Sequence, residues 1–255
     1  MKRTTCVFAV MLVMTTATAA QVLTTRASAD AKVKEPFDEV EQLLVRHLLA
    51  EGGAAIFKVK TRIMRGRVDL SLSPVPGNFE SYEKAPDMEM SIINAPIGQF
   101  ISATDGVSRW RQTPWGAATA GLGGGGNLFK EAAKVKGGFK FRNAFTASRL
   151  KGRVRVDGRE MIVLAATRKG HKPMLMYFDA ETYLLRKQEP DRAAGGWDDN
   201  PLKAIHIDSY ATVDGVKLPA LFRIVTKDFT LTFRVTEVKH NVKIDDRLFT
   251  SPGGK

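Results

Sequence analysis

The residue types that most often carry catalysis are few and scattered in this chain. The four histidines, His47, His171, His206 and His240, show none of the spacings that bring two imidazoles onto one metal ion. His206 and Asp208 would share one face of a predicted strand, where a surface pair explains them better than a metal site does. No G-x-S-x-G motif supplies an acyl-transfer serine. The spacing therefore predicts neither an enzyme nor a bound metal, although a site assembled across the fold stays open.

The glycine-rich run at 121–126 (GLGGGG) formally matches the nucleotide-binding motif G-x-G-x-x-G. That motif binds a dinucleotide only when a strand precedes it and a helix follows it within a parallel βαβ unit. Here Pro114, Trp115 and Gly116 lie shortly before the run, and no phosphate-binding lysine follows it. A flexible loop is the better interpretation, and we expect no cofactor.

The N-terminal residues have the layout of a secretory signal peptide. Lys2 and Arg3 precede a short apolar run at 6–14, and small residues follow at 17–20. A second A-x-A site at 27–29 leaves two possible ends, so the signal peptide is 1–20 or 1–29. The single cysteine, Cys6, lies inside it, which predicts a mature chain without disulfides. We expect a soluble periplasmic protein with a polar leader at 21–35.

The net charge of +12 is high for an exported protein. Such an excess favours anionic membrane surfaces or acidic partners. The basic residues form no block of five or more, which argues against a nucleic-acid partner. Scattered lysines and arginines that solvate strand faces explain the same charge equally well.

The remaining chain divides into one helical segment and a long series of strands. Pro36 begins an amphipathic pattern that ends at Gly52 and Gly53, and 54–60 predicts a second short helical turn. From there the apolar period changes from 3.6 to two, as in antiparallel strands with one apolar face. The alternating apolar residues are Val68, Leu70, Leu72, Met88, Met90, Ile92, Phe229, Leu231, Phe233 and Val235.

Three Asp-Gly pairs predict hairpin turns between these strands, at 105–106, 157–158 and 214–215. Strands joined in sequence by tight turns form a meander, so we expect one broad antiparallel sheet filling most of 62–110 and 150–240. The segment 114–145 interrupts it and contains a helix-prone stretch at 127–136. An insertion of this length is typical of a lid or a binding loop.

A wide sheet with so few helices is expected to leave part of its apolar face uncovered. Methionines suit the lining of an adaptable apolar cavity, although a normal core with methionine as gap filler explains them as well. These methionines are Met64, Met88, Met90, Met161, Met174 and Met176.

Several turn motifs strengthen the cavity interpretation through their order and spacing along the chain. They are 82–86 (YEKAP), 101–110 (ISATDGVSRW), 178–185 (FDAETYLL), 213–219 (VDGVKLP) and 244–252 (IDDRLFTSP). With these segments the chain resembles the LolA/LolB-like periplasmic lipoprotein-carrier superfamily, in particular its outer-membrane lipoprotein-sorting members, over about 37–252. Two features depart from that pattern: the family's lid-closing arginine cannot be placed, and the glycine-rich insertion at 114–145 is not standard.

The resemblance implies a mostly β fold with covering helices, an incomplete antiparallel barrel (a half-barrel) with a helical lid, in a single domain at 36–255. Its apolar face would take lipid or lipoprotein acyl chains, with inner- or outer-membrane proteins or an anionic membrane as further partners. The expected cavity lining is Val68, Leu70, Met90, Ile92, Trp110, Phe229, Leu231 and Phe233. The expected lid residues are Val40, Leu44, Leu48, Leu128 and Phe129.

Three functions remain open at this point. The first is a carrier of lipids or lipoproteins. The second is a periplasmic sensor or assembly module that uses the same fold to bind an exported protein or a lipid signal without transporting it. The third is an exported hydrolase with an unrecognised site. Strand register across the sheet is not readable from the sequence, so the common orientation of the lining residues is an assumption.

Overall fold

The computed structural model describes residues 39–116, 145–168, 172–195 and 201–251. All of these belong to one compact unit, Glu39–Lys255. The predicted signal peptide and leader, the helix-prone stretch at 127–136, and the lid residues Leu128 and Phe129 lie outside the described residues.

The described residues of this unit contain two α-helices, α1 (Glu39–Glu51) and α2 (Ala54–Lys58), as the sequence predicted for this part of the chain. Two short 3-10 helices are η1 (Arg192–Ala194) and η2 (Asp246–Phe249). The first five strands are β1 (Thr61–Leu70), β2 (Gly77–Lys84), β3 (Met88–Ala95), β4 (Gly98–Thr104) and β5 (Arg109–Gln112). The others are β6 (Phe145–Val156), β7 (Arg159–Arg168), β8 (Met174–Asp179), β9 (Leu185–Pro190), β10 (Leu202–Val213), β11 (Val216–Thr226) and β12 (Thr230–His240).

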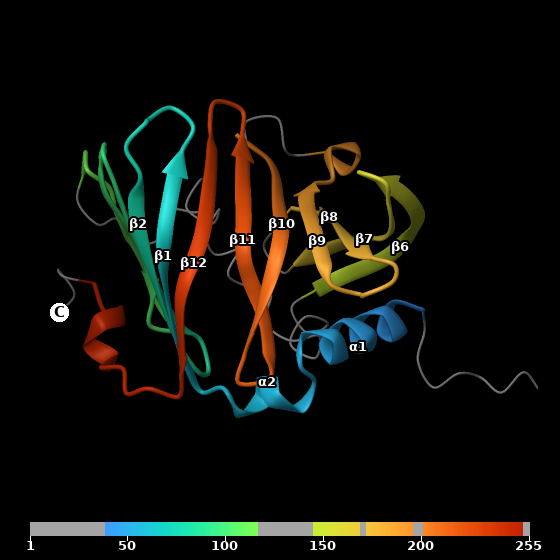
Figure 1. Cartoon of the computed structure of the whole chain (residues 1–255), viewed down its shortest axis with the longest axis horizontal. Coiled ribbons are helices and arrows are strands. Elements are labelled where there is room, and N and C mark those ends of the chain that lie inside the picture. Colours follow the sequence, from blue (N-terminus) through green and yellow to red (C-terminus); the bar gives the residue numbers. More distant parts are fainter. Residues whose placement is uncertain (1–38, 117–144, 169–171, 196–200, 252–255) are drawn as a thin grey trace, which may run out of the picture. The chain divides into compact units, whose positions relative to one another are not determined.

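All strands of the described residues form one antiparallel sheet of 12 strands, in the order β5-β4-β3-β2-β1-β12-β11-β10-β9-β8-β7-β6. The sheet consists of two meanders, β1–β5 and β6–β12, which are joined where β1 pairs with β12 (Figure 1). Because β5 and β6 are its two edges and do not pair with each other, the sheet stays open. The prediction of a mostly β, open antiparallel sheet is confirmed.

The hairpin turns follow the Asp-Gly pairs. Asp157 and Gly158 between β6 and β7 both have positive φ, at 49° and 79°, and Asp214 and Gly215 between β10 and β11 have φ of 50° and 76°. Positive φ at both central residues is the geometry of a type I′ turn, whose twist matches that of the paired strands. These two turns confirm the sequence-based prediction.

The two faces of the sheet pack against different parts of the chain. One face, which we call the helix face, carries the main core, and Leu43 and Leu44 of α1 pack into it. The opposite face is covered over β3–β5 by the segment at 242–249, through Ile244 and Phe249. A smaller cluster around Met161 and Tyr177 lies on the opposite face of β7 and β8.

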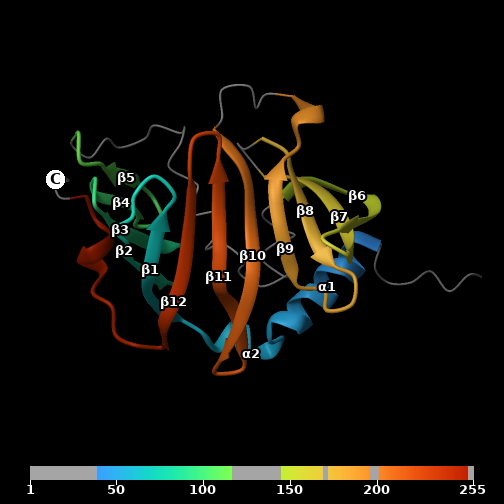
Figure 2. The same cartoon turned by 45° about the horizontal axis from the view of Figure 1, so that its top comes forward.

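Helix α1 lies against the β6–β11 part of the sheet, on the helix face (Figure 2). Its apolar stripe is buried, while Val45 and Leu49 on its other side are exposed. The negative charges of Glu39 and Glu41 in the first turn stabilise the helix, because they lie at the positive end of its dipole. Among the described residues, neither helix has the length and apolar character that crossing a membrane requires.

Candidate functional site

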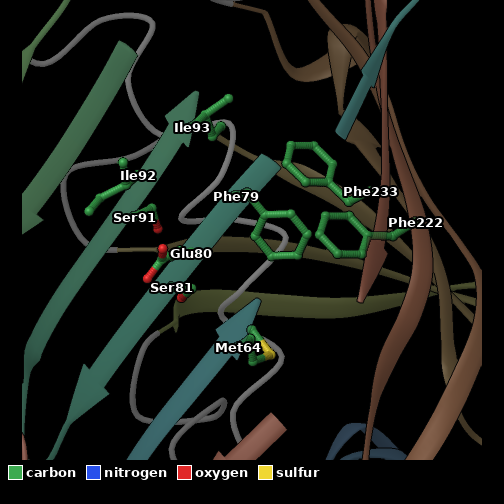
Figure 3. A pocket seen from close by; sticks show the side chains of 9 residues that line it. All are labelled: Met64, Phe79, Glu80, Ser81, Ser91, Ile92, Ile93, Phe222 and Phe233. Carbon is green, nitrogen blue, oxygen red and sulfur yellow. The ribbon is translucent and has the colours of Figure 1, made fainter. Parts of the chain in front are cut away.

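The helix face has a small apolar hollow where β1, β2 and β3 meet β11 and β12 (Figure 3). Its free volume is about 20 Å³, which is room for a water-sized molecule. It is lined by Met64, Phe79, Glu80, Ser81, Ser91, Ile92, Ile93, Phe222 and Phe233. No residue of α1 belongs to this lining, so this part of the face is not covered by α1.

Three aromatic rings form the wall of the hollow. Phe222 and Phe233 are stacked with their centroids 4.7 Å apart, and the edge of Phe79 faces Phe233 at 5.2 Å. Phe222 of β11 pairs with Phe233 of β12, and Phe79 of β2 pairs with Gly66 of β1, the strand that lies between β2 and β12. Such ring pairs stabilise by about 0.5–1.5 kcal/mol beyond their buried area. The wall is therefore a preorganised aromatic surface.

Gly66 makes room for this wall. A Cβ at this position would lie 2.0 Å from the carbonyl oxygen of Arg234 and 2.7 Å from Cε1 of Phe79. The pairing of β1 with β12 shifts between Arg65 and Gly66, as in a β-bulge. Only glycine therefore lets the Phe79 ring and the β12 backbone approach β1 this closely.

The predicted lining residues divide between the two faces of the sheet. Val68, Leu231 and Phe233 are buried on the helix face, where Leu70 and Phe229 pack partly buried against the same core. Val68 pairs directly with Phe233, so these residues share one orientation. This group contains the predicted lining residues that the structure brings together.

The side chains of Met90, Ile92 and Trp110 project to the opposite face, which corrects the assumption of a common orientation. Of these three residues, Ile92 still borders the hollow, between Ser91 and Ile93. Ala103 of β4 pairs with Met90 of β3 on one side and with Trp110 of β5 on the other, so the side chains of Met90, Ala103 and Trp110 point to the same face. The indole N–H of Trp110 donates to the carbonyl oxygen of Phe249 at 2.8 Å. These residues are packed under the C-terminal segment and belong to a second core.

The apolar residue that β3 directs to the helix face is Ile93, which pairs with Phe79 of β2. The sequence-based analysis missed Ile93, Phe79 and Phe222. Both faces of β3 carry apolar side chains, so alternation within β3 did not identify its helix-face side. Figure 3 shows Ile92 and Ile93 projecting to opposite sides of the strand.

Of the predicted lid residues, Val40 and Leu44 of α1 contact the main core, and Leu48 is half-buried. On the same helix, burial lowers the pKa of His47 to about 4 and raises the pKa of Glu51 well above its ordinary value. The nearby Glu51 also contributes to a raised pKa of Tyr210, whose main cause is burial. Helix α1 thus packs against the β6–β11 part of the sheet through buried side chains. Its role as a lid stays a prediction.

His206 and Asp208 lie on the same strand, β10, but Asp208 pairs with Arg223 of β11 and forms no ion pair with His206. Asp208 accepts two hydrogen bonds from the Arg223 guanidinium, at 2.8 and 2.9 Å, and this arginine is the largest cause of its lowered pKa. Burial, followed by the charges of Arg223 and Lys187, lowers the pKa of His206. In the part of the chain that the structure describes, no three metal-ligating side chains come together.

The fold is similar to that of several solved structures. A DUF1329 family protein from Desulfovibrio piger has a TM-score of 0.56 and 12% identity, with 84% of this chain and 98% of that chain covered. A LolA superfamily protein from Nitrosomonas europaea has a TM-score of 0.57 and 11% identity, covering 84% and 99%. A domain assigned to the outer-membrane lipoprotein-sorting proteins, from Vibrio parahaemolyticus, has a TM-score of 0.53 and 12% identity, covering 83% and 97%.

At these identities the likeness concerns the fold alone. No family model matches the chain, and no curated protein is significantly similar to it in sequence.

Proposed function

We propose that this protein is a periplasmic carrier or binding protein for lipid or lipoprotein acyl chains. The observation that carries the proposal is the aromatic hollow on the helix face of an open sheet, in a fold shared with LolA superfamily and lipoprotein-sorting proteins. The proposed lining combines the hollow with its neighbours Val68, Leu70, Phe229 and Leu231.

Transfer of an acyl chain from water into an apolar site is strongly favourable. Burying one methylene contributes about 0.8 kcal/mol, so a chain of roughly sixteen carbons represents on the order of ten kcal/mol. A free volume of about 20 Å³ is far smaller than such a chain. Side chains at the hollow must therefore move apart on binding, and the flexible Met64 is suited to this because its thioether has several accessible rotamers.

The alternative function is a sensor or assembly module that binds an exported partner without transport. The feature that favours it is the edge strand β6, whose side chains are almost all exposed. Among the described residues, Arg149, Lys151 and Arg155 on this strand have no ion-pair partner, whereas Arg153 pairs with Glu160 at 2.9 Å. An edge of this kind can add an extended acidic segment as a further strand, or approach an anionic membrane.

A fluorescent acyl probe tests the carrier proposal. We expect the purified protein to bind the probe, Ile93→Trp to lose most of that binding by filling the hollow, and Ile97→Trp to retain it. Ile97 is a matched control because it is half-exposed in the turn between β3 and β4. Circular dichroism and thermal melting of both variants separate loss of binding from loss of fold, and Ile93→Phe is the milder substitution if Ile93→Trp does not fold.

Native mass spectrometry of the protein isolated from the periplasm supplies a second readout. Co-purified lipid would support the carrier, and a stoichiometric exported protein partner would support the alternative. Absence of both lipid and probe binding in the folded protein would contradict the carrier proposal.

A further inference from the structure

A row of polar side chains crosses the helix face from the hollow to the edge of the sheet. Ser81 pairs with Ser91, Ser91 with Ser102, and Ser102 with Arg111, on the neighbouring strands β2 to β5. At the other end Ser81 pairs with Met64 of β1. Directly paired residues point to the same face of a sheet, so the whole row faces the same side as the aromatic wall. Ser81 and Ser91 already belong to the lining of the hollow (Figure 3).

Arg111 is the unusual member of this row. It is half-buried, and its buried Nε has no hydrogen-bond partner. Within the described part of the chain no carboxylate forms an ion pair with it, and the three serine side chains of the row make no hydrogen bond. A buried donor without an acceptor is destabilising, and more so when the group is charged. The row thus offers several hydrogen-bond donors and one uncompensated positive charge.

Arg62, which lies on the same face, shows how a buried guanidinium is compensated in this sheet. Arg62 precedes Met64 by two residues on β1 and is buried beside Glu83, with Nη1 and Oε2 3.5 Å apart. Its Nε also donates to Nε2 of His240 at 3.3 Å. Among the described residues, no carboxylate stands beside Arg111 as Glu83 stands beside Arg62. This end of the row therefore lacks a hydrogen-bond acceptor within the described part of the chain.

We propose that the ligand is a single-chain amphiphile with an anionic head group, whose acyl chain enters the hollow and whose phosphate or carboxylate binds at Ser102 and Arg111. This inference rests on the proposed function and specifies its ligand class. Three strand spacings of about 4.8 Å separate Ser81 from Arg111, on the order of 14 Å. One lipid molecule therefore reaches from the hollow to the arginine.

An anion fits this row better than a neutral polyol does. Guanidinium groups bind phosphate and carboxylate through two parallel hydrogen bonds, and such charge-assisted bonds are about twice as strong as neutral ones. A sugar or glycerol head group would bind the serine hydroxyls but leave the charge of Arg111 without a counterion. Glu89, on the same face two residues before Ser91, has an interaction of its own, and Glu83 is paired with Arg62.

The test compares palmitoyl lysophosphatidic acid with monopalmitoylglycerol, which have the same acyl chain and differ in the phosphate. Isothermal titration calorimetry of the folded chain should give an affinity at least about tenfold higher for the phosphate lipid. Arg111→Gln should remove this preference, mainly by lowering the affinity for the phosphate lipid. Ser102→Ala should weaken the preference, and Arg67→Gln, on the opposite face of β1, should leave it intact.

Two results would overturn the inference without touching the proposed function. One is equal affinity of the two lipids for the wild type and for Arg111→Gln. The other is binding of inorganic phosphate alone as tightly as the phosphate lipid, which would make the row a free-phosphate site. If neither lipid binds the folded wild type, the proposed acyl-chain function itself fails.

Discussion

His47 and Glu51 face each other inside the core, with Nε2 and Oε1 3.5 Å apart on successive turns of α1. Both side chains are about 1–2% exposed. Nδ1 of His47 lies 2.9 Å from the Tyr183 carbonyl oxygen, so the neutral ring donates there and presents Nε2 as an acceptor. Burial lowers the pKa of His47 and raises the pKa of Glu51, so it favours the uncharged form of each group, and the charge of Arg62 opposes the shift of Glu51 only in part.

Glu51 should make the protein less stable as the pH rises. The pKa of its carboxyl is raised on folding from an ordinary value of 4.5, so above this pH the unfolded chain has lost a proton that the native state retains. The free energy of unfolding therefore falls as pH rises through this window. Glu51→Gln removes the effect and should gain stability relative to the wild type, increasingly toward high pH. Urea unfolding at several pH values measures this difference.

His47 should contribute with the opposite sign. Its pKa falls from 6.5 to about 4 on folding, so stability increases as pH rises through that interval and is lost as pH falls through it. In Glu51→Gln the rise should become visible, because the opposing slope of the carboxyl above pH 4.5 is gone. Parallel pH profiles of the wild type and Glu51→Gln would contradict the assignment of Glu51, and a flat profile of Glu51→Gln between about pH 4 and 6.5 would contradict that of His47.

The buried stripe of α1 should tolerate no charge. Leu44 is 3% exposed within the main core, whereas Leu49 on the same helix is 65% exposed. Leu44→Asp places an unpaired carboxylate among apolar side chains and should reduce the free energy of unfolding by several kcal/mol, about 3 or more. Leu49→Asp should change it by less than about 0.5 kcal/mol. Similar denaturation midpoints for the two variants would mean that α1 does not pack on the sheet.

The C-terminal segment should be part of the folding core. Phe249 is fully buried against the opposite face of the sheet, and its carbonyl oxygen accepts the Trp110 indole N–H. Phe249→Ala should cost about 3–5 kcal/mol, the usual range for a buried phenylalanine. Phe57→Ala is the control, since that ring is half-exposed on α2. Equal thermal stability of the two variants would show that the segment is not tightly packed.

Gly66 should be irreplaceable even by alanine. The added methyl would meet the Arg234 carbonyl and the Phe79 ring at distances that no packed structure accepts, so the β1–β12 pairing must shift. We expect a loss of about 1–3 kcal/mol and a disturbed aromatic wall, visible in near-ultraviolet circular dichroism. Gly116→Ala has open space around it and should be neutral. A stable Gly66→Ala variant with unchanged spectra would argue against the bulge.

The sequence by itself determined the features that depend on neighbours along the chain. The amphipathic period predicted a helix between Pro36 and Gly52, where the structure has α1 at Glu39–Glu51. Alternation predicted strands, and the Asp-Gly pairs predicted hairpin turns. These signals are local, because turn geometry and the solvent preference of successive side chains act within a few residues.

Only the tertiary structure decided which side chains meet. The pairing of β1 with β12 joins residues about 170 positions apart, and it brings the Phe233 ring of β12 against the Phe79 ring of β2, across the strand that carries Gly66. The sequence did not show that Met90, Ile92 and Trp110 point to the face covered by Phe249 and away from the helix face. Strand β3 is apolar on both sides, and a shift of one residue reverses the direction of every side chain. The row from Ser81 to Arg111 likewise exists only through register across four strands, which no alternation within a single strand encodes.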